Sequence, residues 1–79
     1  MYRDFACRKA RALGITGTVE NLKNGGVYVV AEGEEASLKQ YLEALRRGPL
    51  LARVTGITEK WLPFKNEFTN FSIIFYERR

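Results

Sequence analysis

The sequence predicts a two-layer α+β sandwich, in which two helices pack on one sheet. Two segments carry apolar residues at spacings of three and four, as in amphipathic helices, and others alternate apolar and polar residues, as in strands. The elements follow one another in the order α-β-β-α-β-β, so both helices need the same sheet to cover their apolar stripes. With 79 residues, the chain is expected to form a single domain over residues 1–79.

The first half of the chain predicts a helix followed by a β-hairpin. The helix is expected over residues 2–13, where apolar side chains share one face: Tyr2, Phe5, Ala6, Ala10 and Leu13. Strands are expected over 15–21 and 27–32. Asn24-Gly25 between them is one of the strongest short turn signals.

The second half predicts a further helix and two more strands. Glu34 and Glu35 favour a helix start, and the helix is expected to run to Arg47 because Gly48-Pro49 follows. A third strand is expected from about residue 52 to residue 61, and residues 62–70 should form a loop. The last strand is expected over 71–76, where aromatic and aliphatic residues alternate with others.

Composition and charge exclude several classes of function. The net charge of +4 comes from scattered residues and not from a basic stripe, so we expect no nucleic-acid partner. No apolar run approaches the roughly 20 residues of a membrane span, and the N-terminus is charged where a signal peptide would be apolar. We therefore expect a cytoplasmic protein that does not bind membranes.

The chain also lacks the residues of several catalytic and metal sites. It contains no histidine, which excludes histidine-based catalysis and histidine-ligated metals, and a single cysteine, Cys7, which excludes an internal disulfide. Cys7 itself is expected to be a small buried residue of the first helix. We accordingly expect no metal and no cofactor.

A spaced glycine and asparagine pattern carries the strongest resemblance. It stands as Gly17-Thr18-Val19-Glu20-Asn21, followed by Gly25, Val27 and Gly33. Other segments match in the same order, among them AEGEE at residues 31–35, GPLLARV at 48–54 and Phe-x-Ile at 71–73. Over nearly its whole length the chain resembles the acylphosphatase family.

This resemblance implies a fold, a reaction and a set of site residues. The fold would be a ferredoxin-like sandwich with an antiparallel sheet and two helices on one face. The reaction would be metal-independent hydrolysis of the carboxyl-phosphate bond of small acyl phosphates to carboxylate and phosphate. By matched position, Arg3 and Tyr2 would bind the substrate, with Arg3 holding the phosphate, and Asn21 would position the attacking water, so Arg3 and Asn21 would be the catalytic residues.

The chain departs from the family pattern in two ways. Thr18 replaces the usual aromatic residue, and Glu20 places a negative charge one residue from the phosphate site. The printed sequence also begins inside the family's first motif, so we expect the first β-strand and most of the phosphate-binding loop to be missing and activity to be impaired. A complete chain should be a monomer, whereas the truncated chain could re-pair its strands or form a dimer.

Other interpretations of the same residues stay open. Asn21 could cap the turn, because asparagine readily bonds to neighbouring backbone, and Arg3 could simply be solvated. The chain could be a non-catalytic anion-binding or protein-interaction module of the same fold. For Trp61 and Phe64, we favour core packing and loop anchoring over an exposed binding pair.

Overall fold

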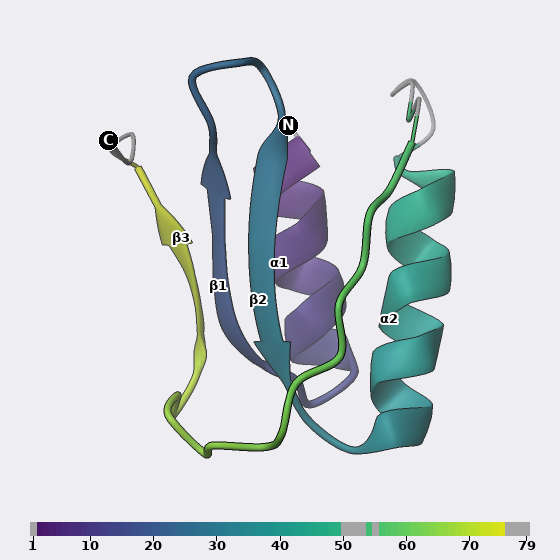
Figure 1. Ribbon diagram of the computed structural model, residues 1–79, viewed down its shortest axis with the longest axis vertical. Coiled ribbons are helices and arrows are strands. Elements are labelled where there is room, and N and C mark those ends of the chain that lie inside the picture. Colours follow the sequence, from purple (N-terminus) through teal and green to yellow (C-terminus); the bar gives the residue numbers. More distant parts are fainter. Residues whose placement is uncertain (1, 50–53, 55, 76–79) are drawn as a thin grey trace.

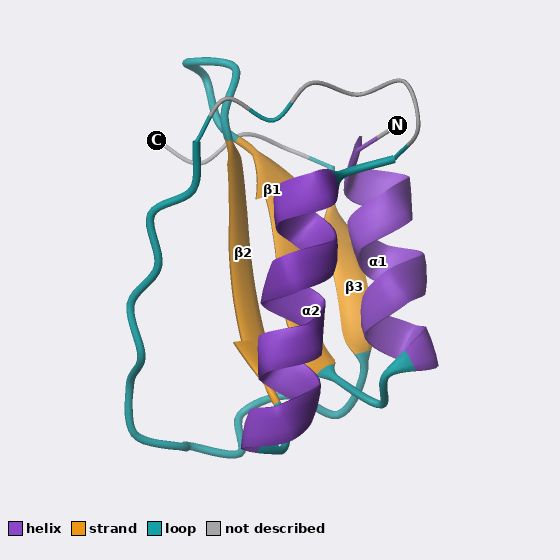
Figure 2. Cartoon of the chain, turned by 90° about the vertical axis from the view of Figure 1, so that its right-hand side faces the viewer, coloured by secondary structure: helices purple, strands orange, loops and turns teal. Residues whose placement is uncertain are grey.

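The computed structural model describes residues 2–49, 54 and 56–75, which form a helical layer and a sheet. Within these residues the elements are α1 (Tyr2–Ala12), β1 (Thr16–Asn21), β2 (Val27–Glu32), α2 (Glu35–Arg47) and β3 (Phe71–Ile74). The sheet has the order β2-β1-β3, and both helices lie on one of its faces (Figures 1 and 2). The predicted two-layer α+β sandwich is confirmed.

The sheet is mixed, and the expected fully antiparallel sheet is wrong in one pairing. β1 pairs with β2 antiparallel, with Val19 opposite Val29, but it pairs with β3 parallel, with Val19 opposite Ile73. The cause is the connection after α2, which carries the chain back along the whole sheet before β3 begins (Figure 1). β3 therefore starts at the same end of the sheet as β1 and runs beside it.

The third strand expected at residues 52–61 is not found in the part of it that the structure describes. Val54 and residues 56–61 form no strand, while residues 52, 53 and 55 lie outside the described residues. Residues 56–66 run in extended form beyond the outer edge of β2 without joining the sheet (Figures 1 and 2). The last strand ends at Ile74 and not at residue 76, which is also outside the described residues.

β2 has an outer edge with no partner among the described strands. The Leu22 amide donates to the Gly26 carbonyl at 2.8 Å. Because antiparallel pairs alternate, the N–H and C=O groups of every second residue of β2 point away from β1. These outward groups belong to Val27, Val29 and Ala31, and they make no backbone hydrogen bond to a described residue outside the sheet.

The core lies between the helices and the sheet, around three large buried side chains. Val19 from β1, Tyr41 from α2 and Phe71 from β3 are almost fully buried, and the Tyr41 and Phe71 rings meet edge to face with centroids 5.9 Å apart. Small residues of α1 let this helix approach them closely: Ala6, Cys7 and Ala10. The expectation of a buried Cys7 is confirmed.

Side-chain hydrogen bonds fasten α1 to its two neighbours. The Tyr41 hydroxyl donates to the carbonyl oxygen of Ala6 at 2.9 Å, which joins the helices. On the other side, the Arg11 guanidinium donates twice to the carbonyl oxygen of Phe71, at 2.8 and 3.2 Å. The position of α1 relative to the sheet is therefore fixed by directional bonds as well as by packing.

Gly17 explains why the motif begins with a glycine. Its φ of 145° belongs to a region that residues with a side chain rarely adopt, and a Cβ there would collide with the carbonyl oxygen of Val30. This close approach lies near one end of the β1–β2 pairing, where Gly17 faces Ala31. Gly17 therefore allows β1 and β2 to pair closely and needs no catalytic explanation.

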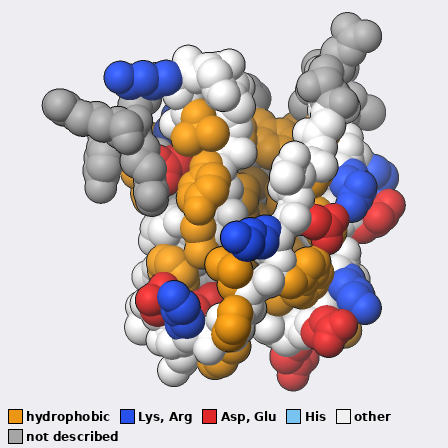
Figure 3. Space-filling view, in the orientation of Figure 1, with side chains coloured by type: hydrophobic (Ala, Val, Ile, Leu, Met, Phe, Trp, Pro, Cys, Tyr) orange, Lys and Arg blue, Asp and Glu red, His pale blue; other side chains and the backbone are white. Residues whose placement is uncertain are grey.

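The surface of the molecule separates charged from apolar side chains. In Figure 3, charged side chains gather over α2, and hydrophobic side chains form a band beside them over the strands and the long connection. Trp61 and Phe64 are 51% and 69% exposed, so the expectation that they pack in the core is wrong. Loop anchoring holds for Trp61, since its indole N–H donates to Glu59 at 2.8 Å.

Candidate active site

Asn21 is the last residue of β1 and lies on the helix side of the sheet. Side chains alternate between the two faces of a strand, so Asn21 shares a face with Val19, which is buried against the helices. The Asn21 side chain is exposed because the strand extends there to the end of the helical layer. It is therefore available to a ligand bound at that end of the sandwich.

The hairpin turn is held by a different asparagine. The Gly26 amide donates to the side-chain oxygen of Asn24 at 2.8 Å, and the Gly25 amide donates to the Leu22 carbonyl at 3.1 Å. These bonds form the turn without Asn21. The side-chain amide of Asn21 makes no hydrogen bond to a described residue. The structure thus removes the turn-capping interpretation of Asn21.

Arg3 lies in the first turn of α1, at the same end of the sheet. Its guanidinium donates through Nη1 to the carbonyl oxygen of Ile74 at 3.1 Å. Ile74 is the register partner of Glu20, the residue before Asn21. Since the first turn of α1 and the end of β1 lie at one end of the molecule (Figure 1), the structure brings Arg3 and Asn21 to the same region.

The start of α1 adds its own attraction for an anion. The first amide groups of a helix have no partner within the helix, and the helix dipole places partial positive charge there. Arg3 adds a full positive charge in this turn, which also carries the acidic Asp4. Glu20, by contrast, follows Val19 and precedes Asn21, so strand alternation places its side chain on the opposite face of the sheet. The sheet therefore separates its carboxylate from the candidate site.

Tyr2 points its side chain away from this anion site. Its hydroxyl donates to the carbonyl oxygen of Leu45 at 2.7 Å, so it fastens the start of α1 to the end of α2. Burial raises the pKa of the Tyr2 hydroxyl above its ordinary value. A role for Tyr2 in substrate binding therefore has to come from its backbone amide in the first turn of the helix.

The end of β3 and the residue after it supply two groups that the sequence did not indicate. The Ile74 carbonyl accepts the bond from Arg3, and the ring centroid of Phe75 lies 5.2 Å from the guanidinium carbon of Arg3. The sequence predicted only that Phe75 shares a strand face with Phe71 and Ile73. Its contact with Arg3 could not be predicted, because the two residues lie 72 positions apart and neither local sequence pattern indicates the other.

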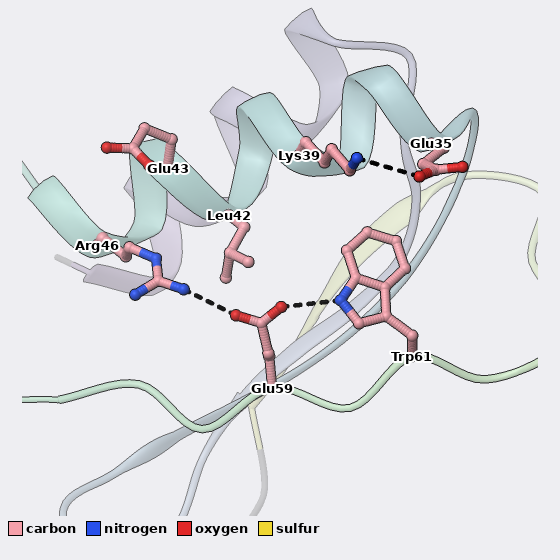
Figure 4. A pocket seen from close by; sticks show the side chains of 7 residues that line it. All are labelled: Glu35, Lys39, Leu42, Glu43, Arg46, Glu59 and Trp61. Carbon is pink, nitrogen blue, oxygen red and sulfur yellow. Dashed lines mark hydrogen bonds and ion pairs between the residues drawn. The ribbon is translucent and has the colours of Figure 1, made fainter.

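A hollow lies on another side of the molecule. It has a volume of about 620 Å³ and lies between α2 and the segment around Glu59 (Figure 4), lined by Glu35, Lys39, Leu42, Glu43, Arg46, Glu59 and Trp61. Two ion pairs lie in it, Arg46 with Glu59 at 2.7 Å and Lys39 with Glu35 at 3.1 Å. The hollow contains neither Arg3 nor Asn21, and the pair of Arg46 with Glu59 anchors the loop to α2.

The described part of the chain offers no place for a metal and no membrane span. No three histidine, cysteine, aspartate or glutamate residues in it lie close enough together to hold an ion. Neither described helix is both long enough and apolar enough to cross a bilayer. The chemistry of the site has to be derived from Arg3, Asn21 and the start of α1.

Comparison with known proteins identifies the family. The family model described as acylphosphatase matches residues 1–73. This chain belongs to the acylphosphatase family. A curated acylphosphatase of Methylococcus capsulatus is 48% identical over 73 residues, which are 92% of this chain and 79% of that protein. Another, of Caldanaerobacter subterraneus, is 46% identical over 84% of this chain and 73% of its own length.

Solved acylphosphatase structures have the same fold. The structure of an acylphosphatase from Coxiella burnetii superposes with a TM-score of 0.86 at 32% identity, over 92% of this chain and 76% of that one. The acylphosphatase crystal structure from Bacillus subtilis gives a TM-score of 0.80 at 30% identity, over 92% and 81%. The acylphosphatase-like fold expected from the resemblance is confirmed, with the mixed sheet as the correction.

Proposed function

We propose that the chain is a metal-independent acylphosphatase in which Arg3 binds the phosphate and Asn21 positions the water. Membership of the family supports the reaction class, the hydrolysis of acyl phosphates. The observation that carries the assignment of residues is the side-chain amide of Asn21, which is exposed and makes no hydrogen bond to a described residue. It lies on the helix side of the sheet, at the end where α1 begins with Arg3.

The proposed reaction needs positioning and charge stabilisation and little proton chemistry. A guanidinium binds two phosphate oxygens at once, and the first-turn amides of α1, including that of Tyr2, bind a third. The Asn21 amide can accept a hydrogen bond from water through its oxygen and donate one to the phosphate through its nitrogen. Water then attacks phosphorus in line with the departing carboxylate, which leaves without needing a general acid.

A non-catalytic anion-binding or protein-interaction module is the weaker alternative. It would use the start of α1 and Arg3 in the same way. It would give no role to the exposed side-chain amide of Asn21, which lies at the same end of the sheet and bonds to none of the described residues. The comparisons favour the enzyme, because the curated relatives across the matched length are acylphosphatases.

The experiment is hydrolysis of benzoyl phosphate by the 79-residue chain in the presence of a metal chelator. We expect Arg3→Ala to lower kcat/KM by about 100-fold or more, as for the loss of a donor to transition-state charge. Arg11→Ala is the matched control, since Arg11 also joins α1 to a β3 carbonyl but at the other end of the strand. It should lower the thermal midpoint and leave the rate of the folded protein within about two-fold. Equal rates for Arg3→Ala and the unchanged chain would refute the assignment.

The compartment and the oligomeric state are finer proposals. We propose that the protein acts in the cytoplasm on a small-molecule acyl phosphate. For the oligomeric state, the alternatives are a monomer and a dimer joined along the outer edge of β2. Sedimentation velocity over a range of concentrations distinguishes them, because only the dimer dissociates on dilution.

A further inference from the structure

Phe75 is the most exposed large apolar residue of the described chain, with 77% of its surface accessible. It follows directly after β3, at the end of the sheet where β1 also ends. Its ring lies against the guanidinium of Arg3, with 5.2 Å between the guanidinium carbon and the ring centroid. An aromatic ring left this open contributes little to the core, so its contact with Arg3 needs an explanation of its own.

The geometry points to Phe75 as a positioning residue for Arg3, an inference that rests on the proposed role of Arg3 in binding phosphate. Two neighbouring groups of the chain hold this side chain: the Ile74 carbonyl accepts from Nη1 and the Phe75 ring lies against the guanidinium. A cation lying on an aromatic face is attracted by the negative charge of that face. The guanidinium is thereby fixed before the substrate arrives.

Within the part of the chain that the structure describes, this arrangement leaves most donors of the arginine available to a ligand. A guanidinium has five N–H donors, and the structure uses one of them, on Ile74. The other donors make no hydrogen bond to a described residue. A side chain held by one bond and one ring, with its remaining donors open, loses less conformational freedom when it binds phosphate.

The test compares two variants at this exposed position: Phe75→Leu removes the aromatic face, and Phe75→Trp keeps one. The first measurement is the dissociation constant of inorganic phosphate, obtained from an NMR titration of the full chain. The second is KM and kcat for acetyl phosphate and for benzoyl phosphate. We expect Phe75→Leu to weaken phosphate binding about two- to five-fold, the range of an exposed cation–π contact, and to raise KM for both substrates by the same factor. Phe75→Trp should restore both values, and kcat and the thermal midpoint should stay unchanged.

Dependence on Arg3 provides the control. In an Arg3→Ala background, Phe75→Leu should have no further effect on phosphate binding. The inference is overturned if Phe75→Leu leaves phosphate affinity unchanged, if its effect persists without Arg3, or if only benzoyl phosphate is affected, since that would make Phe75 a contact for the acyl group.

Failure of the proposed function gives a different result. A chain that binds phosphate through Arg3 but hydrolyses neither substrate would refute the enzyme, and the effect of Phe75→Leu on the phosphate dissociation constant would still decide the role of Phe75. A chain that binds no phosphate would refute both.

Discussion

The hydroxyl of Tyr41 donates to the carbonyl oxygen of Ala6, and this bond of 2.9 Å crosses between the two helices. It joins the middle of α2 to the part of α1 just behind the turn that carries Arg3. Tyr41 also packs edge to face on Phe71 of β3, so one side chain contacts both helices and the sheet. The position of the candidate site relative to the core depends on this residue.

Replacing Tyr41 by phenylalanine should therefore lower the free energy of unfolding and leave the groups of the candidate site unchanged. The variant keeps the buried ring and loses one buried hydrogen bond, which predicts a decrease of about 1 kcal/mol in the free energy of unfolding. Urea denaturation of the variant and of the unchanged chain measures the difference. Equal free energies of unfolding would contradict the prediction.

Stability should fall at alkaline pH. Burial raises the pKa of the Tyr2 and Tyr41 hydroxyls in the folded chain, whereas both titrate near pH 10 when unfolded. Below about pH 10 the hydroxyls are neutral in both states, and their contribution is fully present. Above it the unfolded chain releases protons that the folded chain retains, so the free energy of unfolding decreases as pH rises.

Urea denaturation between pH 8 and pH 11.5 measures this decrease, and Tyr41→Phe should make the slope above pH 10 shallower. A slope that is the same in the variant would show that Tyr41 ionises in the folded state as readily as in the unfolded one.

The two asparagines of the hairpin should separate activity from stability. Asn21→Ala removes an exposed side-chain amide that bonds to none of the described residues, so we expect an unchanged thermal midpoint and a loss of about 100-fold or more in benzoyl phosphate hydrolysis. Asn24→Ala removes the bond to the Gly26 amide, so we expect a loss of about 1 kcal/mol in stability and an unchanged rate. The reverse pattern would return Asn21 to the turn and remove it from the site.

Two glycines differ in what a methyl group would meet. Gly17→Ala would bring a Cβ against the Val30 carbonyl within the β1–β2 ladder, so it should destabilise the chain by about 3 kcal/mol or prevent folding. Gly14→Ala meets no atom within 4 Å and is strained only by its φ of 73°, so it should cost about 1 kcal/mol. Comparable losses would mean that β1 and β2 can move apart at no cost.

The hairpin and both helices could be predicted because their patterns are local. Alternation over residues 27–32 and the Asn24-Gly25 turn agree with each other, and the stripe of α2 includes the buried Tyr41 and Leu45. The strand expected at residues 52–61 is wrong for the residues described there, because a strand needs a neighbour to bond with. Alternation alone does not supply one. The direction of β3 depends on the course of a long connection, which sequence patterns do not show.

The candidate site could also be predicted only where a local pattern or a matched position indicated it. Spacing singled out Asn21 and matched position singled out Arg3, and the structure places them at one end of the sheet. The Ile74 carbonyl and the Phe75 ring could not be predicted, since their contacts with Arg3 join the two ends of the chain. The turn-capping role was assigned to Asn21 as an alternative, although the residue that fills it is Asn24, three positions later.

One arginine of α1 also affects how this sheet can associate. Gly17 bonds to Asn70, so the backbone groups of Phe71 point away from β1, and Arg11 occupies the outward Phe71 carbonyl with two hydrogen bonds. A strand from a second molecule would have to displace this side chain in order to pair along the whole of β3. The outward groups of β2 make no backbone hydrogen bond to a described residue outside the sheet, so β2 is the edge that a second molecule would meet with fewer contacts to break.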